Sequence, residues 1–150
     1  MNTLTDSRSA RHRRNLIAAL TRNPHQANLT KLLNSMLAGE FRTNEVPTIA
    51  FGLMYYQQAN RDFVWNFFVE NMDTFLALLP QERRSVMISL ANSFCDEAKI
   101  TEIKELFEPR LDKMQGGPRQ LAQTIETIEL CAANREAQSP SVNRFFAQRH

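Results

Sequence analysis

The sequence has 150 residues, the length of one ordinary domain, and its 43% hydrophobic and 23% charged residues are typical of a soluble globular protein. A net charge of +2 is too small to indicate a nucleic-acid partner. No apolar run reaches the roughly 18 residues of a membrane span. Only 4 Gly and 6 Pro argue against a loop-rich β-sandwich.

The two cysteines, Cys95 and Cys131, are far apart and form no partner motif. They have neither the density of a disulfide framework nor the spacing of a zinc site. We therefore predict two buried thiols in a reducing compartment. The N-terminus has no apolar signal core, so a soluble, cytoplasmic protein is favoured.

The first segment, Met1–Arg14, is rich in arginine. It could be a transit peptide, a phosphate-binding cluster, or the solvated start of a helix whose apolar face begins at Leu16. We favour the helix start, because Asp6 interrupts the basic run and no aromatic residues accompany the arginines. Residues 1–8 are predicted to be disordered.

Apolar residues at helical spacing and cap signals predict eight helices. The first helix runs to Leu20, the second is capped by Asn23 with Pro24 at its first position, and the third is capped by Thr43 or Asn44. The fourth and fifth helices are Asn60–Leu79 and Gln81–Phe94, and the sixth is capped by Asp96 and ended or kinked by Pro109. The seventh helix follows Gly116-Gly117-Pro118 and runs to about Ala137, and a short last helix is capped by Ser139-Pro140.

The central helix, Asn60–Leu79, is apolar on so much of its circumference that it must be covered on both sides. Trp65, the only tryptophan, lies in its middle. Asn71 and Asp73 are cap-type residues on either side of Met72, so we expect a break in the helix there. Pro80 ends it.

No segment alternates apolar and polar residues over the length of a strand. The predicted fold is therefore all-α, with about eight antiparallel helices in a HEAT-like (armadillo-like) superhelical array that forms a single helical domain, residues 1–150. A compact irregular bundle is the alternative, because the sequence has no internal repeat.

Several short motifs follow one another along the chain: Arg42-Thr43, Arg61, Val64-Trp65-Asn66-Phe67, Glu70-Asn71-Met72-Asp73, Lys99–Phe107 and Gln123–Glu129. Their order and spacing resemble the C-terminal helical domain of the aminopeptidase N family of zinc peptidases, and within it the endoplasmic-reticulum and insulin-regulated aminopeptidases. Met72 stands where that family usually has tryptophan.

The resemblance implies a non-catalytic domain, or a fragment of one, that covers the active-site cavity of a zinc aminopeptidase and contacts peptide substrate. Its partners would be the catalytic and β domains of the parent enzyme, where zinc would be the cofactor. No position here matches the zinc or exopeptidase motifs of the family. We therefore predict no catalytic residue, metal ligand or cofactor in this chain, and no activity of the chain alone. The alternative is a stand-alone helical-repeat scaffold for protein–protein interaction.

Three residues are candidates for peptide contact. Arg61 could hold a peptide carboxylate through a bidentate contact, or it could be a first-turn arginine in an ordinary surface ion pair. Tyr55 and Tyr56 could line a peptide groove or pack between helices.

The first helices of such a fragment would have packed on preceding ones in the parent enzyme. We therefore expect Leu16, Ile17 and Leu20 to be partly uncovered, which would favour self-association through the N-terminal helices.

Overall fold

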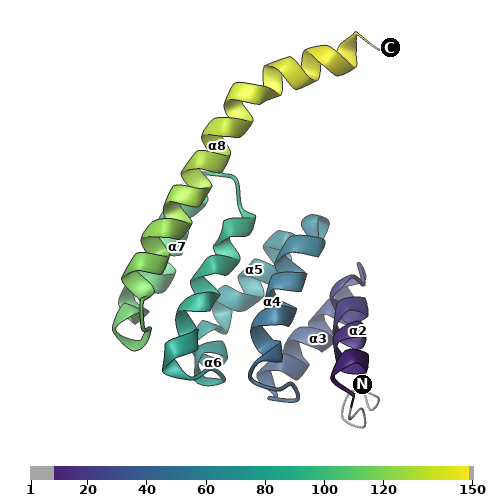
Figure 1. Ribbon diagram of the computed structural model, residues 1–150, viewed down its shortest axis with the longest axis vertical. Coiled ribbons are helices and arrows are strands. Elements are labelled where there is room, and N and C mark those ends of the chain that lie inside the picture. Colours follow the sequence, from purple (N-terminus) through teal and green to yellow (C-terminus); the bar gives the residue numbers. More distant parts are fainter. Residues whose placement is uncertain (1–8, 149–150) are drawn as a thin grey trace. The chain divides into compact units, whose positions relative to one another are not determined.

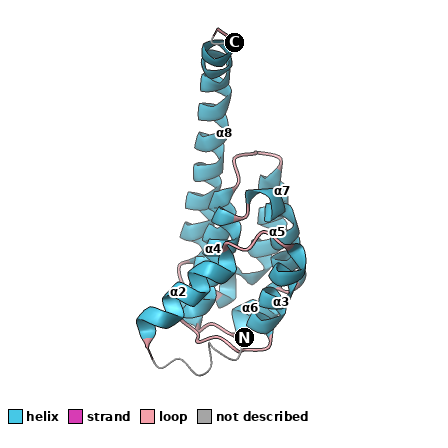
Figure 2. Ribbon diagram, turned by 90° about the vertical axis from the view of Figure 1, so that its right-hand side faces the viewer, coloured by secondary structure: helices cyan, strands magenta, loops and turns pink. Residues whose placement is uncertain are grey.

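The computed structural model describes residues 9–148, and the predicted disorder of residues 1–8 lies outside them. The described residues form helices and loops, with no strand among them, which confirms the all-α fold (Figures 1 and 2). Seven of the helices in this part of the chain are α-helices: α2 (Ala10–Thr21), α3 (Gln26–Leu37), α4 (Glu45–Tyr56), α5 (Arg61–Glu70), α6 (Met72–Ala77), α7 (Lys99–Phe107) and α8 (Gly117–Ala147). Three are 3₁₀ helices: η1 (Gln58–Asn60), η2 (Gln81–Ser93) and η3 (Glu108–Lys113).

The chain divides into two compact units, Met1–Gln81 and Glu82–His150. In the first unit, α2 packs on both α3 and α4, α4 packs on α5, and α6 packs on α3 and α5. Contacts between sequence neighbours are thus combined with contacts that skip along the chain, α2 with α4 and α3 with α6, a packing order that fits the predicted helical array.

The core of the first unit is built around α5 and α6. Trp65, Phe68 and Phe75 are fully buried, and the rings of Phe68 and Phe75 meet edge to face with their centres 4.9 Å apart. The predicted break is confirmed, since α5 ends at Glu70 and α6 begins at Met72. At the break, the side-chain amide of Asn71 donates to the carbonyl of Phe67 at 2.9 Å and so satisfies a backbone acceptor in the last turn of α5.

The start of α3 differs from the prediction. Asn23 was expected to be its N-cap with Pro24 at the first helical position, but α3 begins at Gln26 with His25 as N-cap. The side-chain oxygen of Asn23 accepts instead from the backbone N–H of His25 at 3.0 Å, which makes an Asx turn before the helix. The local turn therefore satisfies the side chain that was expected to cap the helix.

The exposure of the α2 residues corrects two predictions. Ile17 is 4% exposed and belongs to the core, whereas Leu16 and Leu20 are half-buried. The apolar surface expected to drive self-association is therefore smaller than predicted. The segment predicted to be the solvated start of a helix also contains one buried residue, Arg13, which is only 5% exposed.

In the second unit, α7, η3 and α8 pack against one another. The predicted helix Gln81–Phe94 is present as η2, wound as a 3₁₀ helix that ends at Ser93, a length unusual for this winding. Pro109 has the expected effect, since α7 ends at Phe107 and the chain continues as η3. Gly116 adopts a left-handed backbone with φ 72° before α8 begins at Gly117.

The prediction of two helices after Gly117 is wrong, because α8 is one continuous helix with Pro140 inside it. Pro140 has no N–H to donate to the carbonyl four residues earlier, and this kind of defect bends a helix. The neighbouring hydroxyls donate to backbone carbonyls, Ser139 to Arg135 at 2.6 Å and Ser141 to Gln138 at 2.8 Å. The bend towards the C-terminal end of α8 is visible in Figure 1.

The prediction of two free thiols is also wrong. Cys95, which follows η2, and Cys131, on α8, form a disulfide that spans 36 positions of the sequence. Cys131 lies one turn beyond Ile128, the last buried residue of α8. Disulfides persist in oxidising compartments, so the bond removes the support that free thiols would have given to a reducing compartment.

Replacing Trp65 with alanine should lower the free energy of unfolding by about 3–5 kcal/mol, because it removes a fully buried aromatic side chain and leaves a cavity. Urea denaturation followed by circular dichroism measures this loss. Asn66→Ala, at the exposed neighbouring position, is the matched control and should change stability by no more than about 0.5 kcal/mol. Equal midpoints for Trp65→Ala and the wild type would contradict the prediction.

Replacing both cysteines with serine should destabilise the unit Glu82–His150 by about 2–4 kcal/mol, because the unfolded chain would no longer be restricted by the cross-link. Denaturation with and without dithiothreitol measures the effect. The reductant should lower the stability of the wild type and leave the double variant unchanged. A wild type that is insensitive to complete reduction would show that the bond contributes nothing to stability.

Candidate functional site

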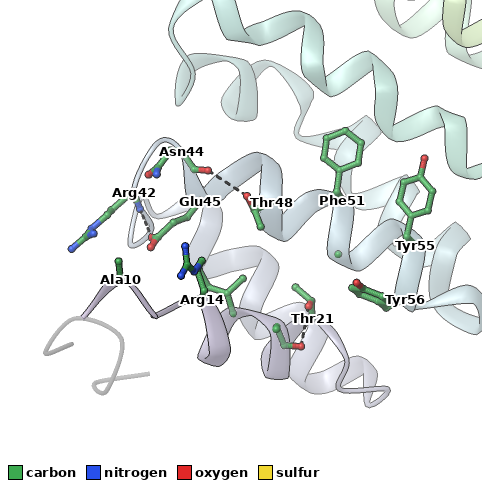
Figure 3. Close-up of a pocket in the computed structure, with 13 residues that line it drawn as sticks. Ala10, Arg14, Thr21, Arg42, Asn44, Glu45, Thr48, Phe51, Tyr55 and Tyr56 are labelled. Atoms are coloured by element: carbon green, nitrogen blue, oxygen red, sulfur yellow. Dashed lines mark hydrogen bonds between the residues drawn. The ribbon is translucent and has the colours of Figure 1, made fainter. Parts of the chain in front are cut away.

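The first unit has a groove of about 690 Å³ between α2 and α4 (Figure 3). It is lined by Ala10, Arg14, Ile17, Ala18 and Thr21 of α2, by Arg42 and Asn44 of the preceding loop, and by Glu45, Thr48, Phe51, Gly52, Tyr55 and Tyr56 of α4. Its volume is in the range of about 300–1,000 Å³ that small-ligand sites occupy.

The two walls are held together at both ends. At their N-terminal ends the Arg13 guanidinium donates to both carboxylate oxygens of Glu45, at 2.7 and 2.6 Å. At their C-terminal ends the side-chain amide of Gln57 donates to the carbonyl of Thr21 at 2.7 Å. The two helices therefore run in the same direction along the groove.

Near the C-terminal end of α2, Gly52 allows α2 to approach α4 closely. A Cβ at this position would lie 2.9 Å from the Cβ of Thr21, closer than side chains tolerate. The absence of a side chain at Gly52 thus permits this close contact between two residues that line the groove.

The Arg13–Glu45 pair is largely removed from solvent, with the two side chains 6% and 12% exposed. The hydrogen bonds from Arg13 lower the pKa of Glu45, and the backbone N–H of Arg42, 3.0 Å from the carboxylate, acts in the same direction, while burial opposes both. The pKa of Arg13 is raised by its hydrogen bonds to Glu45. Both groups are therefore charged at neutral pH.

Tyr55 and Tyr56, two of the three predicted contact residues, lie at the C-terminal end of the groove. They are 45% and 58% exposed, so neither is packed into a helix interface. The ring of Tyr55 lies 6.1 Å from that of Phe51, and the guanidinium of Arg22 lies 4.8 Å from the centre of the Tyr56 ring. This end offers exposed aromatic surface together with one cation.

Arg61, the third predicted residue, does not line the groove. It is half-buried at the start of α5, and its Nε donates to the carbonyl of Met54 at 3.2 Å. That carbonyl belongs to the last turn of α4, whose acceptors lack partners within the helix. Arg61 therefore ties α5 to the turn of α4 that carries the two tyrosines.

Sequence reasoning did not identify Arg14, Arg42 and Phe51 as site residues. Phe51 and Tyr55 are four residues apart on a helix, a spacing that places them on one face and could have been noticed. Arg14 and Arg42 come from segments far apart in the sequence, and only the packing of α2 on α4 brings both to one groove.

The second unit has a shallower, polar hollow of about 410 Å³, lined by Asp96, Glu97, Ala132, Arg135, Glu136 and Ser139. No group of three or more His, Cys, Asp or Glu side chains suited to a metal ion occurs within residues 9–148. No helix in this part of the chain is long and apolar enough to cross a membrane. The α2–α4 groove is therefore the candidate site.

Comparison with known proteins gives one family. The family model described as "ERAP1-like C-terminal domain" matches residues 1–130, which include the whole groove and α8 up to Leu130. No curated protein is similar enough to the chain to count as a match.

Replacing Glu45 with glutamine should lower the free energy of unfolding by about 3–5 kcal/mol at neutral pH, because the largely buried Arg13 would lose its ion pair with the Glu45 carboxylate. In the wild type the folded pKa of Glu45 lies below its ordinary value of 4.5. The stabilisation is therefore present above that value and is lost as the pH falls through the lower, folded pKa.

Denaturation midpoints measured from neutral to acidic pH test this, with Glu40→Gln as an exposed control close by in the chain. The difference between wild type and Glu45→Gln should shrink as the pH falls below 4.5. A difference that is independent of pH would contradict the assignment.

Proposed function

Since the chain belongs to the family of ERAP1-like C-terminal domains, a non-catalytic part of aminopeptidases, we propose that it covers the active-site cavity of a zinc aminopeptidase and contacts the peptide substrate. Zinc and the catalytic residues would then belong to other domains of the parent enzyme. These catalytic and β domains are its proposed partners.

The observation that carries the proposal is the position of Tyr55 and Tyr56 in the α2–α4 groove. Both side chains are about half exposed and stand on the wall of an open hollow. Tyrosine suits such a role because it presents a large rigid ring at a small cost in conformational entropy, with a hydroxyl that can bond to a peptide backbone. We propose that these two residues contact the peptide.

Arg61 has a supporting place in the proposal. Its hydrogen bond to the carbonyl of Met54 holds the residue directly before Tyr55. Losing this bond would leave a helix-end acceptor without its partner and would loosen the last turn of α4. We propose that Arg61 keeps the tyrosines in position and does not bind the peptide carboxylate, because its Nε is already bonded to the carbonyl of Met54.

We expect the Tyr55→Ala and Tyr56→Ala variants to bind peptide at least about tenfold more weakly than the wild type, because each removes exposed ring surface from the groove. Isothermal titration of the 150-residue chain with unstructured peptides longer than the groove measures this. Tyr55→Phe and Tyr56→Phe, which keep the rings, should lose much less.

Phe146→Ala is the control, since Phe146 is an equally exposed aromatic residue on α8. When the chain is incubated with an aminoacyl substrate, we expect it to release no amino acid. The proposal is wrong if no peptide binds, or if Phe146→Ala weakens binding as much as the tyrosine variants. Chelator-sensitive release of amino-terminal residues would contradict the non-catalytic role.

A further inference from the structure

The α2–α4 groove has chemically different ends. Arg14 and Arg42 lie at one end, close to Glu45, and the aromatic rings of Phe51, Tyr55 and Tyr56 lie at the other (Figure 3). The N-terminal ends of both helices are at the arginine end, as the Arg13–Glu45 pair requires. A ligand that fills the groove would therefore meet a different chemistry at each end.

The arginine end has a net positive charge. Glu45 is the one acidic residue among those that line the groove, and its charge is compensated by the two hydrogen bonds from Arg13. Arg14 and Arg42 are exposed and add two positive charges. The first turns of α2 and α4 add the positive ends of two helix dipoles, which favour an anion further.

The aromatic end suits an apolar group, and its cation, the guanidinium of Arg22, lies 4.8 Å from the centre of the Tyr56 ring. The rings of Phe51 and Tyr55 lie side by side, and Tyr56 is 58% exposed. An apolar side chain that covers these rings would remove hydrocarbon surface from water on both partners, which is favourable.

The distance between the ends sets the spacing of the two groups. Glu45 and Tyr55 are ten positions apart on α4, and a rise of about 1.5 Å per residue separates them by roughly 15 Å. An extended peptide advances about 3.3–3.4 Å per residue, so roughly four or five residues cover this distance.

We propose that the groove selects a peptide segment with an acidic side chain at Arg14 and Arg42 and an aromatic or large aliphatic side chain at Tyr55 and Tyr56, separated by four or five positions of extended chain. This rests on the peptide-contact function proposed above and adds the chemistry of the ligand to it. Arginine is suited to the acidic group because its planar guanidinium can hold a carboxylate through two hydrogen bonds.

The test uses three peptides, each acetylated and amidated so that no terminal charge remains. The first is Gly-Glu-Ala-Ser-Ala-Phe-Gly, the second has glutamine in place of glutamate, and the third has the glutamate moved next to the phenylalanine. Isothermal titration with the 150-residue chain should give at least about tenfold tighter binding for the first peptide than for the other two. The preference should weaken as salt is added, since the two arginines are exposed.

Two sets of variants assign the preference to residues. Arg14→Gln with Arg42→Gln should abolish the difference between the first two peptides, whereas Arg14→Lys with Arg42→Lys should keep part of it, because lysine retains the charge and loses the bidentate geometry. Arg119→Gln, an exposed arginine on α8, is the control and should leave the preference intact. Circular dichroism of each variant confirms that the helices are retained.

The outcomes separate this inference from the proposed function. Equal binding of the glutamate and glutamine peptides, with loss of both in Tyr55→Ala, would overturn the acidic preference and leave peptide contact in place. Tighter binding of a peptide whose only carboxylate is its free C-terminus would overturn the side-chain assignment. Failure of all peptides to bind would overturn both proposals.

Discussion

The bidentate contact between Arg13 and Glu45 sets the register of α2 against α4. A pair of charges removed from solvent is favourable only in good geometry, so it tolerates little sliding of one helix along the other. With this register, Thr21 lies against Gly52 and the carbonyl of Thr21 reaches Gln57. The groove, and the residues on each of its ends, follow from the placement of one ion pair.

The composition of α4 becomes understandable from this arrangement. The helix is apolar on most of its circumference, because two of its faces meet other parts of the molecule. Ile49 and Leu53 are fully buried in the core. Thr48, Phe51 and Tyr55, at helical spacing on another face, line the groove. A helix that carries both core residues and groove-lining residues therefore lacks the clear polar face of an ordinary surface helix.

Much of the fold could be predicted from local patterns. Asn71 and Asp73 marked the break between α5 and α6, and Trp65 marked the centre of the core, because caps and apolar periodicity act over a few residues. Pro140 misled the prediction, since a proline can be accommodated inside a helix at the cost of one backbone hydrogen bond and a bend, and α8 continues through it.

The features that the prediction missed depend on segments far apart in the sequence. Cys95 and Cys131 carry no local sign that they are bonded. Arg13 could not be told from the other arginines of its segment until Glu45 was placed beside it. Tyr55 and Tyr56 were candidates for the groove, whereas Arg14 and Arg42 required the packing of α2 on α4. Contacts between distant segments thus determine the part of the site that local sequence patterns do not predict.

The Cys95–Cys131 bond also makes a covalent ring of α7, η3 and the first half of α8. A protease that cuts within this ring, for example at the exposed Gln115, leaves the two pieces joined through sulfur. The nicked protein would migrate as one species under non-reducing electrophoresis and as two after reduction. The bond therefore protects the connectivity of this unit against a single backbone cleavage as well as its folded state.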